Sequence, residues 1–318
     1  MRSTAFAFLA YAVSLRATPT AQALDVHVAA LKGPTGIGMS RLLLNQPSFG
    51  AGLHWIYEVL PSPQELVARV ASHEVDVAVL PANTAAKLYT DGPGYRMGAV
   101  VGWGVLYLVS RDPTVKGWAD LKGKEVLCVG KGATPDFVTR FVLARNYLEP
   151  DTDVRLSFSF SQEQIAQLLI AKRAETAILP EPFVTQVLAR AADMRVVLDL
   201  QKEWSAALGV RDPYPISVVV VSPRLIERDA DAVERFLQSY AESIRWVNDN
   251  VAEAAVLVGK LDIMPEDVAR AAIPRCNLDF VRGAAGRAAM EAYLTVLSGF
   301  DSAAVGSHLP DEGFYITR

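Results

Sequence analysis

The segment DVAVLP at residues 76–81 recurs as ETAILP at residues 175–180, and this pair of segments decides the fold. Residue 76 falls on residue 175, an offset of 99. The same offset, without a gap, places KGPT (32–35) on KGAT (131–134) and Ser62 on Ser161. Matches at one fixed offset in three separated segments indicate an internal repeat. The chain is therefore expected to contain two similar units, each about as long as this offset.

Each unit is expected to alternate strands with helices. Short apolar runs rich in β-branched residues predict strands, and apolar residues at helical spacing predict the segments between them. The strands are expected at 25–31, 54–60, 76–80, 124–130, 154–160 and 175–179, and the helices at 34–44, 63–72, 134–147 and 162–173. This alternation predicts an α/β fold in which each lobe is a mostly parallel sheet flanked by helices. Ligands of such sheets gather beyond the carboxyl ends of the strands.

Two long apolar strands are expected at 104–110 and 215–222, and each is followed by a turn signal. Together they enclose the residues that are expected to form an inserted domain. They are expected to cross between the lobes as a hinge, with the loops of both lobes facing one cleft. The expected lobes are 24–110 plus 215–318, which includes helices from Pro223 onward, and 111–214.

The N-terminus has the pattern of a secretory signal peptide over residues 1–23. Arg2 precedes an apolar run over residues 6–15, and Ala21 and Ala23 supply small side chains for cleavage near Ala23. The run is too short for a membrane-spanning helix, which needs about 20 apolar residues. The alternative is an amphipathic first helix. We expect export, with cleavage near Ala23.

The composition excludes several classes of protein. The 318 residues are 51% hydrophobic and 21% charged, which is typical of a globular chain and not of a disordered one. The balance of 31 Lys and Arg against 35 Asp and Glu offers no basic surface for nucleic acid. Two cysteines and four scattered histidines provide no metal-ligand spacing. A bridge between Cys128 and Cys276 would lock the hinge, so no disulfide is expected.

Several further segments carry a family resemblance. They are KGPTGIGM (32–39), DLKGK (120–124), GKGATP (130–135), LPEPF (179–183), AIPRCN (272–277) and LPDEGFY (309–315). In this order they resemble the substrate-binding proteins of ABC importers, and most closely the nitrate/sulfonate/taurine-type cluster. The resemblance covers essentially the whole mature chain.

This resemblance implies the two-lobed type II periplasmic-binding-protein fold and a periplasmic location. It further implies delivery of a small molecule to an inner-membrane ABC permease and its ATPase. We expect a monomer that needs no cofactor. The resemblance names no ligand. The alternative is an enzyme on the same fold, acting on a small aromatic or vitamin-precursor metabolite. Such enzymes act in the cytosol, and the sequence contains no nucleophile elbow, zinc-protease motif or Walker loop.

The candidate ligand contacts lie in the loops that follow the predicted strands. Glycines let the backbone approach a ligand, helix starts present free N–H groups, and lysines add charge, which suits an anionic or strongly polar molecule. The serines could instead cap their helices, Glu181 could cap a helix or accept from a ligand amine or hydroxyl, and the aromatic residues could stack on a ligand or pack the hinge. The full set is Lys32, Gly33, Pro34, Thr35, Ser62, Asn83, Thr84, Trp103, Lys131, Gly132, Ala133, Thr134, Ser161, Glu181 and Tyr214.

Overall fold

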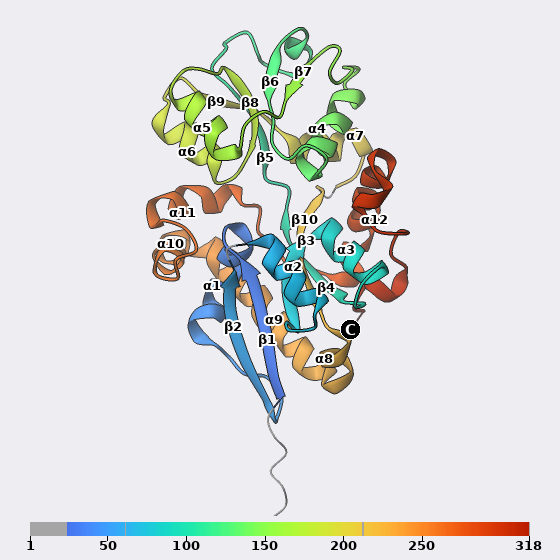
Figure 1. Ribbon diagram of the computed structural model, residues 1–318. Coiled ribbons are helices and arrows are strands. Elements are labelled where there is room, and N and C mark those ends of the chain that lie inside the picture. Colours follow the sequence, from blue (N-terminus) through green and yellow to red (C-terminus); the bar gives the residue numbers. More distant parts are fainter. Residues whose placement is uncertain (1–23, 61, 212, 318) are drawn as a thin grey trace, which may run out of the picture.

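The computed structural model describes residues 24–60, 62–211 and 213–317, and its strands form two separate sheets stacked end to end (Figure 1). The first sheet, with its helices and the C-terminal helices, is called the first unit; the second sheet, with its helices, is the second unit. The expected signal peptide and its cleavage site at Ala23 lie outside the described residues.

The first sheet has six strands in the order β11-β4-β10-β3-β1-β2. Strand β1 pairs in parallel with β2 and β3, whereas β10 pairs antiparallel with both β3 and β4, so β1 to β4 all run in one direction. The strands are β1 Leu24–Leu31, β2 Leu53–Leu60, β3 Val77–Pro81, β4 Arg96–Trp103, β10 Pro215–Val221 and β11 Val281–Arg282.

The second sheet repeats this arrangement with five strands in the order β7-β6-β8-β5-β9. Strand β6 pairs in parallel with β7 and β8, and β5 pairs antiparallel with β8 and β9. The strands are β5 Leu106–Ser110, β6 Glu125–Leu127, β7 Arg155–Ser157, β8 Thr176–Pro180 and β9 Arg195–Asp199. Both sheets are therefore mixed, with a parallel majority. The crossing strand, β10 or β5, runs against this majority, and in the first sheet the short β11 runs against it as well.

The helices begin where the sequence supplies start signals. Proline occupies the first turn of α1, α2, α4 and α8, and serine side chains cap α2, α5 and α8. The helices are α1 Pro34–Asn45, α2 Pro63–Ala71, α3 Ala82–Thr90, α4 Thr134–Arg145, α5 Gln162–Ile170, α6 Phe183–Arg190, α7 Leu200–Leu208, α8 Pro223–Arg228, α9 Ala230–Asp249, α10 Val251–Lys260, α11 Glu266–Ala272 and α12 Gly283–Phe300, with short 3₁₀ turns at Trp118–Leu121 (η1), Ile273–Arg275 (η2), Ser302–Ala304 (η3) and Glu312–Phe314 (η4).

The two units are joined where two connections cross. Only two residues separate the end of β4 from the start of β5. The first of them is Gly104, whose N–H donates to the carbonyl of Tyr214, just before β10, at 3.0 Å. Asn277 Nδ2 donates to the Gly104 carbonyl at 2.6 Å. A Cβ at Gly104 would overlap the Tyr214 ring. Residues 106–110, which were expected in the first lobe, pair with β8 and β9 of the second sheet. The chain therefore crosses between the units in short connections, one between β4 and β5 and one just before β10. The bounds of the complete lobes stay a prediction.

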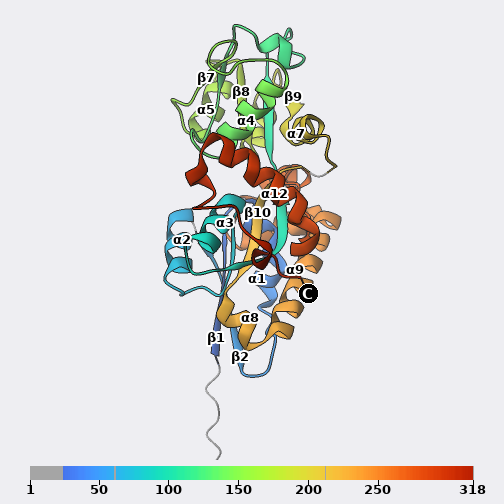
Figure 2. The same ribbon diagram turned by 90° about the vertical axis from the view of Figure 1, so that its right-hand side faces the viewer.

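An apolar core runs without interruption through the junction. Trp204 of α7 lies edge-on to Tyr214 at 5.4 Å, and Tyr214 stacks on Tyr293 of α12 at 6.3 Å between ring centroids. All three rings are buried, and they belong to a core cluster that includes residues of both sheets. Figure 2 shows α12 lying across the junction. The units are thus joined on this flank by buried aromatic packing.

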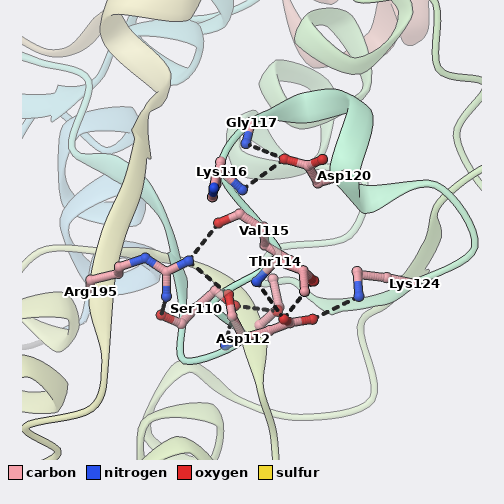
Figure 3. Close-up of polar contacts among 10 residues, drawn as sticks. Ser110, Asp112, Thr114, Val115, Lys116, Gly117, Asp120, Lys124 and Arg195 are labelled. Atoms are coloured by element: carbon pink, nitrogen blue, oxygen red, sulfur yellow. Dashed lines mark hydrogen bonds and ion pairs between the residues drawn. The ribbon is translucent and has the colours of Figure 1, made fainter.

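The DLKGK segment (120–124) has a structural role within the second unit. Asp120 accepts hydrogen bonds from two backbone N–H groups just before it, and Lys124 pairs with Asp112 at 2.7 Å (Figure 3). The hydrogen bond from Lys124 holds the pKa of Asp112 well below its usual range. Arg195 donates to three backbone carbonyls of the same loop. These contacts fix the loop that follows β5.

The substitution Gly104→Ala should destabilise the protein strongly, because its methyl group would overlap the Tyr214 ring at the crossing. Overpacking of this kind costs roughly 1–3 kcal/mol. Urea unfolding monitored by circular dichroism measures the loss. The matched control is Gly117→Ala, where a Cβ meets no atom within 4 Å. Equal stability of the two variants would contradict the tight crossing.

Candidate functional site

The carboxyl ends of the parallel strands of the two sheets face each other. Because β4 passes through only two residues into β5, its end, and with it the ends of β1 to β3, points toward the second unit. In the second sheet Leu106, at the start of β5, pairs with Pro180, at the end of β8. The ends of β6, β7 and β8 therefore point back toward the first unit. Helix starts from both units meet in this region.

The starts of α1 and α3 lack a polar side chain to satisfy their N–H groups. Gly33 is the N-cap of α1, with φ of 90°, and Pro81 precedes α3. Within the described part of the chain, neither start has a side-chain cap or an acidic residue in its first turn. Strands β1 and β3 are neighbours in the sheet, so the two helix starts are neighbours as well. Free N–H groups and the positive ends of two helix dipoles gather there.

Side-chain acceptors bond to backbone N–H groups in or just before three helix starts of the second unit. The Gly132 N–H donates to Asp136 Oδ2 at 2.9 Å, the Ser161 hydroxyl accepts from Gln164 N, and Glu181 Oε2 accepts from Thr185 N at 3.1 Å. The sequence predicted two equivalent anion-ready loops after β1 and β6. The structure makes them unequal, because Asp136 in the first turn of α4 supplies a carboxylate that α1 lacks.

The two lysines of the repeat, Lys32 and Lys131, also have different surroundings. Lys32 pairs with Asp262 at 2.7 Å, and this hydrogen bond lowers the pKa of Asp262. Lys131 is exposed and has no ion-pair partner among the described residues. Direct contact of either lysine with a ligand stays a prediction.

The hydroxyl side chains of the repeat mostly bond to the protein. Ser62 accepts from Glu65 N as the cap of α2, the counterpart of Ser161 on α5. Thr35, which follows Pro34, donates to the Leu31 carbonyl at 2.7 Å. Thr134, which follows Ala133, shares a 2.7 Å hydrogen bond with the Tyr293 hydroxyl of the first unit. Thr134 thus ties the start of α4 to α12.

Asn83 and Thr84, in the first turn of α3, line a hollow of about 660 Å³ within the first unit. Asn83 Nδ2 donates to the Ala304 carbonyl at 3.3 Å, so this side chain bonds to the C-terminal segment. Trp103 and Tyr214 pack at the junction, with 6% and 0% of their surface exposed. Their stacking on a ligand stays a prediction.

Glu181 is a buried carboxylate at the boundary of the units. The residue is 3% exposed, and its Oε1 has no hydrogen-bond partner among the described residues. Burial raises its pKa, while the hydrogen bond from Thr185 and the charge of Arg275 oppose the shift. Arg275 Nε lies 3.9 Å from Oε1. Arg275 belongs to the AIPRCN segment, which lies outside the repeat, and no sequence spacing relates it to residue 181, so the sequence alone does not predict this contact.

Metal-binding and membrane-spanning features can be assessed for residues 24–60, 62–211 and 213–317. No group of three or more His, Cys, Asp or Glu side chains in these ranges could hold a metal ion. None of their helices is long and apolar enough to cross a membrane. Cys128 and Cys276 are both buried and free.

Residues 48–259 match the family model described as "ABC transporter, phosphonate, periplasmic substrate-binding protein". The chain belongs to this family. It is therefore the periplasmic substrate-binding component of an ABC importer, with a small-molecule ligand and a permease partner, and not an enzyme. The importer class predicted from the sequence is confirmed. No curated protein matches the chain.

Solved structures agree with this binding protein in fold. An ABC transporter protein from Parabacteroides distasonis is 26% identical, with a TM-score of 0.80 over 93% of this chain and 99% of that one. The periplasmic aliphatic sulphonate binding protein of Escherichia coli is 15% identical, with a TM-score of 0.71 over 92% of each chain. The nitrate-binding protein of Synechocystis PCC 6803 is 14% identical, with a TM-score of 0.61 over 88% of this chain and 82% of that one. The type II periplasmic-binding fold predicted from the sequence is confirmed.

The substitution Glu181→Gln tests the buried carboxylate. Because its pKa is raised in the folded state, the folded protein binds the proton more tightly, and stability falls as the pH rises through and above the ordinary value of 4.5. The free energy of unfolding of the wild type, relative to Glu181→Gln, should therefore decrease from pH 4.5 to neutral pH. Urea unfolding at several pH values measures the difference.

The control for this experiment is Glu242→Gln, on an exposed position of α9. It should show no comparable trend between the same pH limits. A wild-type to Glu181→Gln difference that is flat or rises with pH would contradict the raised pKa.

Proposed function

We propose that this binding protein captures a small organic oxyanion, a phosphonate or sulfonate, between its two units. One observation carries the proposal: the neighbouring starts of α1 and α3 have neither a side-chain cap nor a first-turn acid among the described residues. Free backbone N–H groups at a helix start are a ready site for an anion. The description of the family and the names of two similar proteins, which bind sulphonate and nitrate, support the same class of ligand.

In this proposal the first unit binds the anionic group first. Backbone N–H groups of the first turns of α1 and α3 are fixed in direction, so they need no rearrangement to receive charge. Gly33 leaves open space beside them, because no atom lies within 4 Å of the place a Cβ would take. Lys131, exposed on the second unit, and Ser161, at the start of α5, would contact the ligand after closure.

The two units act as lobes in this mechanism, with the second inserted near residues 104 and 213. Ligand contacts from both lobes favour the closed form, and the permease with its ATPase recognises that form. We propose a monomer that is exported, with its signal peptide removed near Ala23, and that needs no cofactor, metal or nucleic acid.

A thermal-shift screen tests the ligand class. The compounds are methylphosphonate, ethanesulfonate and nitrate, with neutral dimethyl sulfone as the control. A ligand at a hundredfold excess over its Kd adds about 2.7 kcal/mol of stability, so a binder raises Tm clearly. A shift with methylphosphonate or ethanesulfonate and none with the sulfone is expected, and a shift with nitrate alone would contradict an organic ligand. A shift with none of the anions would overturn the proposal.

The substitution Gly33→Trp should abolish this binding, because the indole would fill the space in front of the free N–H groups of α1. The control is Gly52→Trp, in the same unit. Both glycines have positive φ, 90° and 72°, and a Cβ on either meets nothing within 4 Å. Both variants therefore carry backbone strain without a steric clash at Cβ, and the Tm of each measures what that strain costs. Isothermal titration calorimetry with the anion found in the screen compares them. Full binding by Gly33→Trp would place the site elsewhere.

A further inference from the structure

The two flanks of the junction are held by different kinds of contact. On the α12 flank, Phe137 of α4 stacks on Phe300 at 5.7 Å between ring centroids, and the buried Tyr293 shares a hydrogen bond with Thr134 of α4. On the opposite flank, α11 packs against α6, and the polar contacts come from Arg275 of η2. Figure 1 shows these two flanks on opposite sides of the crossing strands. Opening the Arg275 flank would therefore separate fewer buried rings than opening the α12 flank.

Arg275 belongs to the first unit, and its contacts here belong to the second. Its Nη1 donates to Thr185 Oγ1 at 3.2 Å, and its carbonyl accepts from the Tyr107 hydroxyl at 3.2 Å. Its Nε lies 3.9 Å from Glu181 Oε1, which is too long for a hydrogen bond. We call this group of contacts the polar seam.

Both charged members of the polar seam have unused hydrogen-bonding capacity. A guanidinium has five N–H donors, and Arg275 uses one of them on the described residues. Its side chain is 40% exposed, so the remaining donors are open to a ligand. Glu181 is almost fully buried, and its charge attracts the guanidinium although the two groups form no hydrogen bond. This attraction holds the guanidinium at the boundary between the two units.

The segment that leads to Arg275 begins beside the start of α1. Lys32, just before α1, pairs with Asp262, which lies between α10 and α11. Ile263 lies only 3.2 Å from the place that a Cβ on Gly36 of α1 would take. Helix α11 then leads directly into η2 and Arg275. Residues 262–275 therefore run from the start of α1 to the start of α6, and they carry a partly free guanidinium at the α6 end.

We propose that Arg275 is a ligand-binding residue, whose guanidinium donates to the oxyanion held at the start of α1, while Glu181 and Thr185 position it from the second unit. The inference rests on the proposed function. Phosphonate and sulfonate oxygens match the planar donor pair of arginine. Arg275 also contacts Thr185 and Tyr107 of the second unit. The same residue would therefore couple ligand binding to the approach of the two units.

The experiment measures the affinity of methylphosphonate and ethanesulfonate by calorimetry for the wild type, Arg275→Met, Arg275→Lys and Arg270→Met. Loss of a charged hydrogen-bonding group should weaken binding roughly 10- to 100-fold in Arg275→Met. Arg275→Lys should recover part of the affinity, because it keeps the charge but loses the planar pair. Arg270 is the matched control, since it lies on α11 in an exposed pair with Glu266 and faces no seam residue in the described structure.

The outcomes separate this inference from the function it rests on. Anion binding by the wild type with unchanged affinity in Arg275→Met overturns the role of Arg275 and leaves the function intact. Equal losses in Arg275→Met and Arg275→Lys, with lowered Tm in both, indicate a structural role and also overturn it. If Arg275→Met does not fold, Arg275→Gln, which can still bond to Thr185, replaces it with the same expectations. Binding of neither anion by the wild type overturns the proposed function, and this inference with it.

Discussion

The close approach of two backbone connections at Gly104 and Tyr214 governs the arrangement of the whole molecule. The strand that leaves the first sheet and the strand that returns to it touch there through a backbone hydrogen bond, and the ring of Tyr214 occupies the space that any side chain at residue 104 would need. Asn277, from a third segment, closes the contact by bonding to the Gly104 carbonyl. Because the crossing is so tight, the carboxyl ends of both sheets are held face to face.

The two units contribute different kinds of groups to the region between them. The C-terminal helices of the first unit reach past the crossing on both flanks, with α12 bringing aromatic rings and η2 bringing Arg275. The second unit meets them with carboxylates beside its helix starts. Asp136 accepts from the Gly132 N–H just before α4, and Glu181 accepts from Thr185 N in the first turn of α6. The helix starts next to β1 and β3 have no such carboxylate among the described residues. A ligand that binds there is met from the other side by side chains rather than by bare helix ends.

The sequence allowed the architecture to be predicted, because a repeat at one offset repeats every strand, turn and cap. Ser62 and Ser161 illustrate this, since both cap helices at equivalent places. The individual contacts of the site could not be predicted in the same way. Lys32 pairs with Asp262, which lies 230 residues away, and no pattern in the chain records that distance. The ring of Tyr214 is buried by α7 and α12, which only the folded chain brings together.

The position of β10 has a consequence for the order of folding. In the first sheet β10 lies between β3 and β4, and β4 joins the other parallel strands only through it. The first sheet therefore stays divided until residues 215–221 are available, after the whole second unit has been made. The second sheet depends on no such late segment, since its strands lie within residues 106–199. During synthesis the inserted unit can mature first, and the unit that contains the N-terminal strand must wait for a contact of long sequence separation, which is the slow kind to form.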